Sequence, residues 1–243
     1  MHGTTLTPAD GNPPSSTTIE PYPAVPADLD SLSIILVRTN RLNILEYGVG
    51  HSTMVFARHI YRMQEHPLWV NVDLPDPAFP IEANVVDASM EYIGYWAKRL
   101  VEEYQDFADG LVTFHHKRPE LVNIGNQIVS CYPYMPKVPP DFIYIDAPER
   151  EQTKMPDAFE PIIGDVLRYE AFLMPNTIIV IDGRAMQARF LFRNLKNTWA
   201  YRYCPERDQH FFVQSEGWLG LPKHERLIKE IYYANGPWTI EDL

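Results

Sequence analysis

The stretch that decides the fold is Ile44-Leu45-Glu46-Tyr47-Gly48-Val49-Gly50-His51-Ser52-Thr53. The apolar run over residues 42–47 predicts a short buried strand, and the glycines predict a tight turn directly after it. A helix is expected over residues 52–66, because Ser52 or Thr53 suits its N-cap. The sequence thus predicts a strand, a glycine turn and a helix in immediate succession.

The alternation of strand and helix continues along the chain. We expect strands at residues 84–87, 111–114, 141–146 and 177–182, and helices at residues 90–105, 165–173 and 185–196. Two further strands, at residues 199–203 and 210–213, predict a terminal hairpin. Apolar strands that alternate with helices are typical of a parallel sheet with helices on both faces. The predicted fold class is therefore α/β, a doubly wound, mostly parallel sheet with a C-terminal antiparallel hairpin.

Residues 1–30 differ in composition from the rest of the chain. They include many Ser and Thr residues, no Lys or Arg, and prolines at positions 8, 13, 14, 21, 23 and 26. Such a segment buries too little apolar surface to offset the entropy lost on ordering. We predict a disordered N-terminal arm over residues 1–30, either a solvated tail or a docking arm for a partner, and one domain over residues 31–243.

The composition narrows the classes of function. A formal net charge of -11 disfavours a surface that follows the phosphates of a nucleic acid. The chain shows neither an apolar run of roughly 18 residues nor the basic and apolar regions of a signal peptide, so we expect no membrane span and a cytoplasmic location. Cys131 and Cys204 are expected to be reduced core thiols. The sequence carries no signal for the oligomeric state.

The glycine turn departs from the dinucleotide-binding pattern, which would place a third glycine at position 53. The pattern over residues 46–53 is E-x-G-x-G-x-S-T. It resembles the first motif of the class I S-adenosylmethionine-dependent methyltransferases, which have a Rossmann-like fold. The resemblance implies S-adenosylmethionine as cofactor, held over glycines that let the backbone pass close beneath it. The cofactor residues it implies are Glu46, whose carboxylate would serve the cationic methionine end, and Tyr47, Gly48, Gly50, Ser52 and Thr53.

A second part of the resemblance is Val85-Val86-Asp87-Ala88-Ser89, which leads directly into the predicted helix at residue 90. In the family, an acidic residue at the end of the second strand holds the ribose hydroxyls, and Asp87 matches it. Asp87 lies 37 positions after Gly50, beyond the ~20 typical of dinucleotide folds. Asp73, 23 positions after Gly50, is the alternative. The preference for Asp87 implies an insertion over residues 67–82.

The predicted fourth and fifth strands end in Asp146 and Asp182. In the family, the residue at the end of the fourth strand faces the methyl group or the acceptor. A hydroxyl acceptor needs a base to take its proton, and the candidates are Asp146, His115 and Asp182. His115 is alternatively part of an exposed polar pair at a strand end, and Asp182 with Gly183 is alternatively a turn.

A magnesium ion is one further possibility. The related catechol-type enzymes hold Mg²⁺ with aspartates after the fourth and fifth strands and a neighbouring Asn, and hard cations prefer such oxygen ligands. Here Gly183 stands in the place of that Asn. We therefore assign no metal ligand and disfavour Mg²⁺. Arg184 and Lys117 are candidates for holding an anionic substrate.

The resemblance implies a methyltransferase that uses S-adenosylmethionine and acts on a hydroxyl of a small or sugar-like molecule. The main alternative is a non-catalytic relative that serves as a scaffold, since fold alone does not fix function. A nicotinamide-dependent oxidoreductase is disfavoured by the missing third glycine. A DNA amino-methyltransferase is disfavoured by the net charge and by Asp146-Ala147-Pro148-Glu149, which lacks the motif D/N-P-P-aromatic.

Overall fold

A computed structural model of the protein describes residues 22–65, 81–153 and 160–214. Its centre is a seven-stranded sheet with the strand order β3-β2-β1-β6-β7-β9-β8. The strands are β1 (Asn43–Tyr47), β2 (Glu82–Asp87), β3 (Val112–His116), β6 (Phe142–Ile145), β7 (Ile178–Asp182), β8 (Trp199–Cys204) and β9 (Gln209–Gln214). The strands from β3 to β7 in this order pair in parallel, and β9 is antiparallel to both β7 and β8. The predicted doubly wound, mostly parallel sheet with a C-terminal antiparallel hairpin is confirmed.

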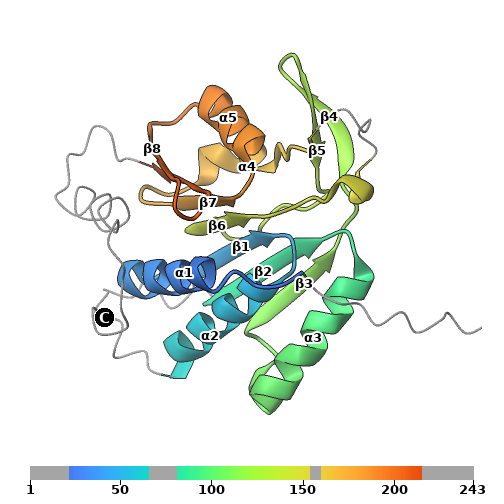
Figure 1. The fold of residues 1–243 in the computed structure, drawn as a ribbon, viewed down its shortest axis with the longest axis vertical. Helices are drawn as coiled ribbons and strands as arrows, with labels where there is room; N and C mark the ends of the chain where they lie inside the picture. Colours follow the sequence, from blue (N-terminus) through green and yellow to red (C-terminus); the bar gives the residue numbers. More distant parts are fainter. Residues whose placement is uncertain (1–21, 66–80, 154–159, 215–243) are drawn as a thin grey trace, which may run out of the picture.

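Helices cover both faces of the sheet (Figure 1). One layer consists of α1 (Pro26–Thr39), α2 (His51–Glu65) and α3 (Met90–Tyr104), and the other of α4 (Asp165–Tyr169) and α5 (Ala185–Asn194). The chain also forms short 3-10 helices at Gln105–Phe107, Arg150–Gln152 and Glu170–Phe172. None of the helices in the described ranges combines the length and apolar character that a membrane span requires.

Consecutive residues of the central strands face opposite helix layers, as strand geometry requires. Ile44, Phe142 and Ile178 belong to one buried cluster, which includes Leu32 of α1 and Phe56 of α2. Their neighbours Leu45, Ile143 and Ile179 belong to a second cluster, which includes Val166 of α4 and Phe190 of α5. Burial on both faces explains why most residues of these strands are apolar.

The N-terminal boundary of the domain differs from the prediction. Helix α1 begins at Pro26, inside the segment predicted to be disordered, and its buried residues include Leu32, Ile35 and Leu36. Proline is well tolerated at the start of a helix, because the amide that it lacks has no intrahelical partner there. The prediction of disorder is therefore wrong for residues 26–30, while residues 1–21 lie outside the described part of the chain.

A second hairpin was also absent from the predicted elements. Strands β4 (Glu120–Ile124) and β5 (Gln127–Cys131) form a two-stranded antiparallel sheet that stands away from the main sheet (Figure 1). Gly125 has φ 59° in its turn, a conformation that glycine adopts without strain. The dipeptide Gly125-Asn126 between two apolar runs is a hairpin signal that could have revealed it.

Candidate functional site

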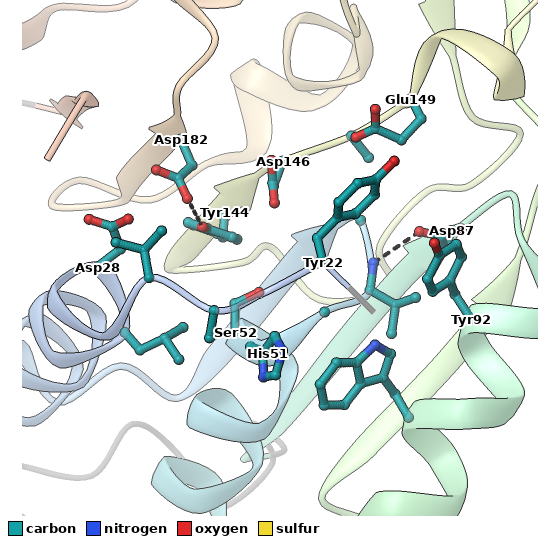
Figure 2. Close-up of a pocket in the computed structure, with 18 of the residues that line it drawn as sticks. Tyr22, Asp28, His51, Ser52, Asp87, Tyr92, Tyr144, Asp146, Glu149 and Asp182 are labelled. Atoms are coloured by element: carbon teal, nitrogen blue, oxygen red, sulfur yellow. Dashed lines mark hydrogen bonds between the residues drawn. The ribbon is translucent and has the colours of Figure 1, made fainter. Parts of the chain in front are cut away.

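A cavity of ≈ 250 Å³ opens beyond the carboxyl ends of the parallel strands (Figure 2). Its walls come from the glycine turn after β1, from the ends of β2, β6 and β7, and from the starts of α1, α2 and α3. The strand order reverses between β1 and β6, and ligands of doubly wound folds bind at this kind of switch point. The cavity is therefore the candidate binding site.

The glycine turn forms the floor of the cavity. Gly48 has φ 100°, and its N–H donates to the Val86 carbonyl at 3.0 Å. A Cβ at position 48 would lie 2.9 Å from the Ala147 Cβ and 3.1 Å from the main-chain carbon and oxygen of Asp146. Both the backbone conformation and the close approach to the end of β6 therefore require glycine here.

Glu46 lies beneath this turn and not in the cavity. It is fully buried, and its carboxyl group accepts hydrogen bonds from the hydroxyls of Ser52 and Thr53, the latter at 2.6 Å. The Thr53 hydroxyl in turn accepts the Gly50 N–H at 3.0 Å. Burial raises the pKa of Glu46 well above its ordinary value, against the effect of these hydroxyls. In this structure Glu46 fixes the glycine turn to the start of α2 and does not line the cavity, and contact of its carboxyl group with a cofactor stays a prediction.

The predicted cofactor residues thus divide into two groups. Gly48, Gly50, Ser52 and Asp87 line the cavity. The other group does not line the cavity and is buried beneath it: Glu46, Tyr47 and Thr53. Tyr47 points toward the opposite helix layer, where its hydroxyl is 3.0 Å from that of Tyr169.

Asp87 ends β2 and is held in place by main-chain amides. Oδ2 accepts the N–H of Val49 at 2.9 Å, and Oδ1 accepts the N–H of Ser89 at 2.6 Å. Gln152 Nε2 also donates to Oδ1 at 3.3 Å. Burial raises the pKa of Asp87, while the amides of Ser89 and Val49 lower it. Oδ2 retains a lone pair, so it can accept a further hydrogen bond from a ligand. The alternative, Asp73, lies outside the described residues, as do residues 67–80 of the predicted insertion over 67–82 and the C-terminal residues 215–243.

Asp146 follows β6 and lies near the middle of the cavity in Figure 2. Its side chain is 52% exposed, and Arg184 Nε is 3.7 Å from Oδ1. Desolvation in the cavity raises the pKa of Asp146 to about 7, an effect opposed by Arg184 and reinforced by Asp182. A carboxyl group with this pKa changes its protonation state near neutral pH, as a general base requires.

Arg184 contacts the segment after β6 and does not line the cavity, so the geometry gives no support to its predicted contact with an anionic substrate. Its guanidinium donates to the main-chain oxygens of Asp146 and Pro148 and to the Glu149 carboxylate, each at 3.0 Å. The side chain is only 13% exposed. Arg184 therefore acts on the cavity through Asp146.

Replacing Arg184 with Gln is expected to raise the pKa of Asp146 above about 7, because the nearest positive charge is removed. The pKa can be followed by ¹³C NMR of the Asp146 carboxyl group during a pH titration. Arg189→Gln, an exposed position on α5, serves as the control and should leave this pKa unchanged. An Asp146 pKa that is unchanged or lowered in Arg184→Gln would contradict the assigned role of Arg184.

The end of β7 brings Asp182 to the same cavity. Asp182 Oδ2 accepts the hydroxyl of Tyr144 at 2.6 Å, and both residues line the cavity. Burial raises the pKa of Asp182, while the hydrogen bond from Tyr144 lowers it. Asp146 and Asp182 are thus brought together as the sequence predicted.

His115 is placed elsewhere. Strand β3 continues to His116, so His115 lies within the strand opposite Val86 and not in the loop after it. Its Nε2 is 2.9 Å from Asn84 Oδ1, and its ring packs against Tyr134 with centroids 4.3 Å apart. His115 does not line the cavity, so the prediction that it is catalytic has no support in this geometry.

Comparisons with known proteins find similarity to this chain only among solved structures. No protein-family model matches the chain, and no curated protein matches it. An O-methyltransferase from Bacillus cereus in complex with SAH (S-adenosylhomocysteine) is 13% identical, with a TM-score of 0.46, and the match covers 83% of this chain and 86% of that one. An SAH-bound methyltransferase from Podospora anserina is 10% identical, with a TM-score of 0.47 and 78% of each chain covered. A function must therefore be inferred from the cavity of this chain.

The cavity lining also includes residues that were not among the predicted site residues, such as Tyr22, Asp28, Tyr92 and Tyr144. Tyr22 and Asp28 belong to the segment predicted as a disordered arm, and Tyr144 belongs to an apolar run that predicted only a buried strand. Ser89 accepts the N–H of Tyr92 at 3.2 Å as the N-cap of α3. That cap is visible in the sequence and places the first turn of α3 beside Asp87.

A metal site is not evident in the described ranges, where no three His, Cys, Asp or Glu side chains gather closely enough to hold an ion. Gly183 has φ 60° after β7 and contributes no side chain at the position of the family's Asn. The residues present therefore do not form the oxygen-rich set that Mg²⁺ prefers.

Proposed function

We propose that the protein is an S-adenosylmethionine-dependent methyltransferase whose acceptor is a hydroxyl group of a small molecule. The observation that carries the proposal is the pairing, in one cavity, of the glycine turn after β1 with the Asp87 carboxylate at the end of β2. The turn offers bare backbone against which a nucleoside can lie, and the carboxylate offers an acceptor for its ribose hydroxyls.

The charge of the cavity favours this cofactor over a dinucleotide. The described lining residues include Asp28, Asp87, Asp146, Glu149 and Asp182, and no Lys or Arg. A pyrophosphate would be repelled by these carboxylates, whereas the sulfonium of S-adenosylmethionine carries the opposite charge. The acidic walls therefore support a sulfonium nucleoside as the ligand.

The reaction needs alignment and one proton acceptor. The acceptor oxygen attacks the methyl carbon in line with the sulfonium, the bond between sulfur and methyl breaks, and the thioether leaves with the electron pair. The hydroxyl proton passes to a base, and Asp146 lies in the cavity with a pKa of about 7. Asp182 Oδ2 accepts a hydrogen bond from the Tyr144 hydroxyl at 2.6 Å and so fixes the orientation of that hydroxyl.

Calorimetric titration with S-adenosylmethionine and with SAH tests the cofactor. We expect wild-type protein to bind both, and Asp87→Asn to bind each about tenfold to a hundredfold more weakly, because a charged hydrogen-bond acceptor is lost. Asp109→Asn, at an exposed position away from the cavity, is the matched control and should bind as wild type does.

The same titration separates the proposal from a non-catalytic scaffold. If folded wild-type protein binds neither compound, the methyltransferase proposal is rejected and the non-catalytic scaffold remains as the explanation. Binding with unchanged affinity in Asp87→Asn would reject this location of the ribose.

A further inference from the structure

Helix α5 and the neighbouring part of β8 form a second surface of interest (Figure 1). The ring of Phe192 on α5 lies edge-on to the ring of Tyr201 on β8, with centroids 5.4 Å apart. Phe192 is 64% exposed and Tyr201 is 39% exposed. Met186, Arg189 and Arg193 are also exposed on α5. We call these five residues the α5–β8 surface, and none of them is among the described residues that line the cavity.

Helix geometry brings the two arginines together beside the exposed ring. Arg189 and Arg193 are four residues apart, which makes them neighbours on the helix surface, and Arg189 stands three residues before Phe192. Within the described ranges, no carboxylate forms an ion pair with either guanidinium. On the opposite helix layer, by contrast, Arg58 is paired with Glu103 at 3.3 Å. The two α5 charges are therefore available to a binding partner.

The local charge is opposite to that of the chain as a whole. Residues 184–204 contain no Asp or Glu and five basic residues: Arg184, Arg189, Arg193, Lys196 and Arg202. The formal net charge of the whole chain is -11. The acidic residues that follow at the hairpin turn are engaged locally, since Asp208 accepts the Tyr203 hydroxyl and Glu206 accepts the Cys204 thiol. A small positive surface on a negative protein is complementary to a short acidic segment, whereas the rest of the chain would repel a long polyanion.

We infer that the α5–β8 surface binds a short peptide segment of a partner protein, with acidic and apolar side chains. Arg189 and Arg193 each bind a carboxylate through paired N–H groups, and the apolar side chains pack on the rings of Phe192 and Tyr201. Aromatic residues, Met and Arg are the types in which protein interfaces are enriched, so the composition of the surface also favours a protein partner. This inference goes beyond the proposed function, because the surface lies outside the cavity.

Peptide arrays probed with the full-length protein test the inference. One array holds short peptides composed of Asp, Glu, Leu, Phe and Tyr, and in a second array Lys and Arg replace the two acids. We expect binding to the first array and not to the second, and weaker binding as sodium chloride is added. The peptide that binds most tightly is then titrated against variants by fluorescence anisotropy. Arg189→Gln/Arg193→Gln should bind it at least about tenfold more weakly, because charged hydrogen bonds are lost.

Matched variants control for net charge and for exposed apolar area. Lys98→Gln/Arg99→Gln on α3 changes the net charge by the same amount at exposed positions and should bind the peptide as wild type does. Phe192→Gln should bind about threefold to tenfold more weakly, because apolar contact area is lost. Phe172→Gln removes a ring that is 67% exposed elsewhere on the protein and should leave the affinity unchanged. Thermal unfolding checks that each variant is folded.

Equal binding to the two arrays, no binding to the acidic array, or an equal loss in the α3 control would overturn the inference. Unchanged affinity in Arg189→Gln/Arg193→Gln would overturn it as well. A single-stranded oligouridylate serves as the remaining probe. If it binds more tightly than the acidic peptide and loses this affinity in Arg189→Gln/Arg193→Gln, the surface is assigned to nucleic acid instead.

Discussion

Gly48→Ala is expected to lower the free energy of unfolding by about 2–4 kcal/mol, through strain at a positive φ and crowding at the end of β6. The added Cβ would stand 2.9 Å from the Ala147 Cβ and 3.1 Å from the backbone of Asp146. Because that backbone is part of a buried strand end, it has little room to retreat. The protein that remains folded should also bind SAH more weakly, since the floor of the cavity and Asp146 would shift together.

Urea unfolding and SAH calorimetry on the same preparation measure both effects. Gly94→Ala is the matched control, because Gly94 is exposed in the middle of α3 with nothing within 4 Å of the added Cβ. It should be as stable as wild type or about 0.5–1 kcal/mol more stable, since alanine favours the helix. Wild-type stability in Gly48→Ala would show that the turn is not packed against β6 as described.

Glu46→Ala is expected to cost about 2–4 kcal/mol of stability, from an internal cavity and from two hydroxyls left without their acceptor. Ser52 and Thr53 both donate to this carboxyl group, and Thr53 in turn holds the Gly50 amide. Loss of the group would loosen the turn that forms the cavity floor. We therefore expect weaker SAH binding as well, although Glu46 does not line the cavity. Thermal unfolding with and without SAH measures both quantities.

Glu46→Gln keeps the shape of the side chain and provides the control for this effect. Its carbonyl oxygen can still accept one hydroxyl, so most of the stability and of the SAH affinity should be retained. A loss equal to that of Glu46→Ala would contradict a packing and hydrogen-bonding role and would indicate that the charge itself is needed.

The pH dependence of stability also depends on Glu46, because burial raises its pKa well above the ordinary 4.5. The folded protein then keeps a proton that the unfolded chain releases. The stability contributed by the protonated group is fully present below pH 4.5 and is lost as the pH rises through the pKa of the folded state. Glu46→Gln removes this loss, so its stability relative to wild type should increase with pH above 4.5 in urea titrations at several pH values. A constant difference across that range would contradict the raised pKa.

The sequence was sufficient to predict the parallel sheet and the position of the cavity. Apolar strands such as residues 177–182 are buried on both faces, and the glycine turn follows β1 as predicted. These features depend on local pattern, which a single sequence contains. The positions of Asp87, Asp146 and Asp182 at the cavity could be predicted for the same reason, since each ends or follows a strand that could be recognised.

The errors arose where tertiary packing decides the direction of a side chain. Glu46 lies one residue before the end of β1, where the strand alternation directs it under the start of α2 and away from the cavity. His115 was predicted to follow its strand, but pairing of β3 with β2 extends through His116. The position of Asp28 at the cavity was missed because α1 is preceded by a proline-rich segment, and only the packed structure brings the first turn of α1 to the cavity.

The central claim is that a nucleoside cofactor lies on the glycine turn beside Asp87. Amide NMR spectra of the labelled protein, titrated with SAH, test this most directly. We predict that the largest shifts occur at Gly48, Val49, Gly50 and Ser89, because the amides of Val49 and Ser89 donate to the Asp87 carboxylate that would receive the ribose. Shifts confined to another part of the chain, or none at saturating SAH, would contradict the claim.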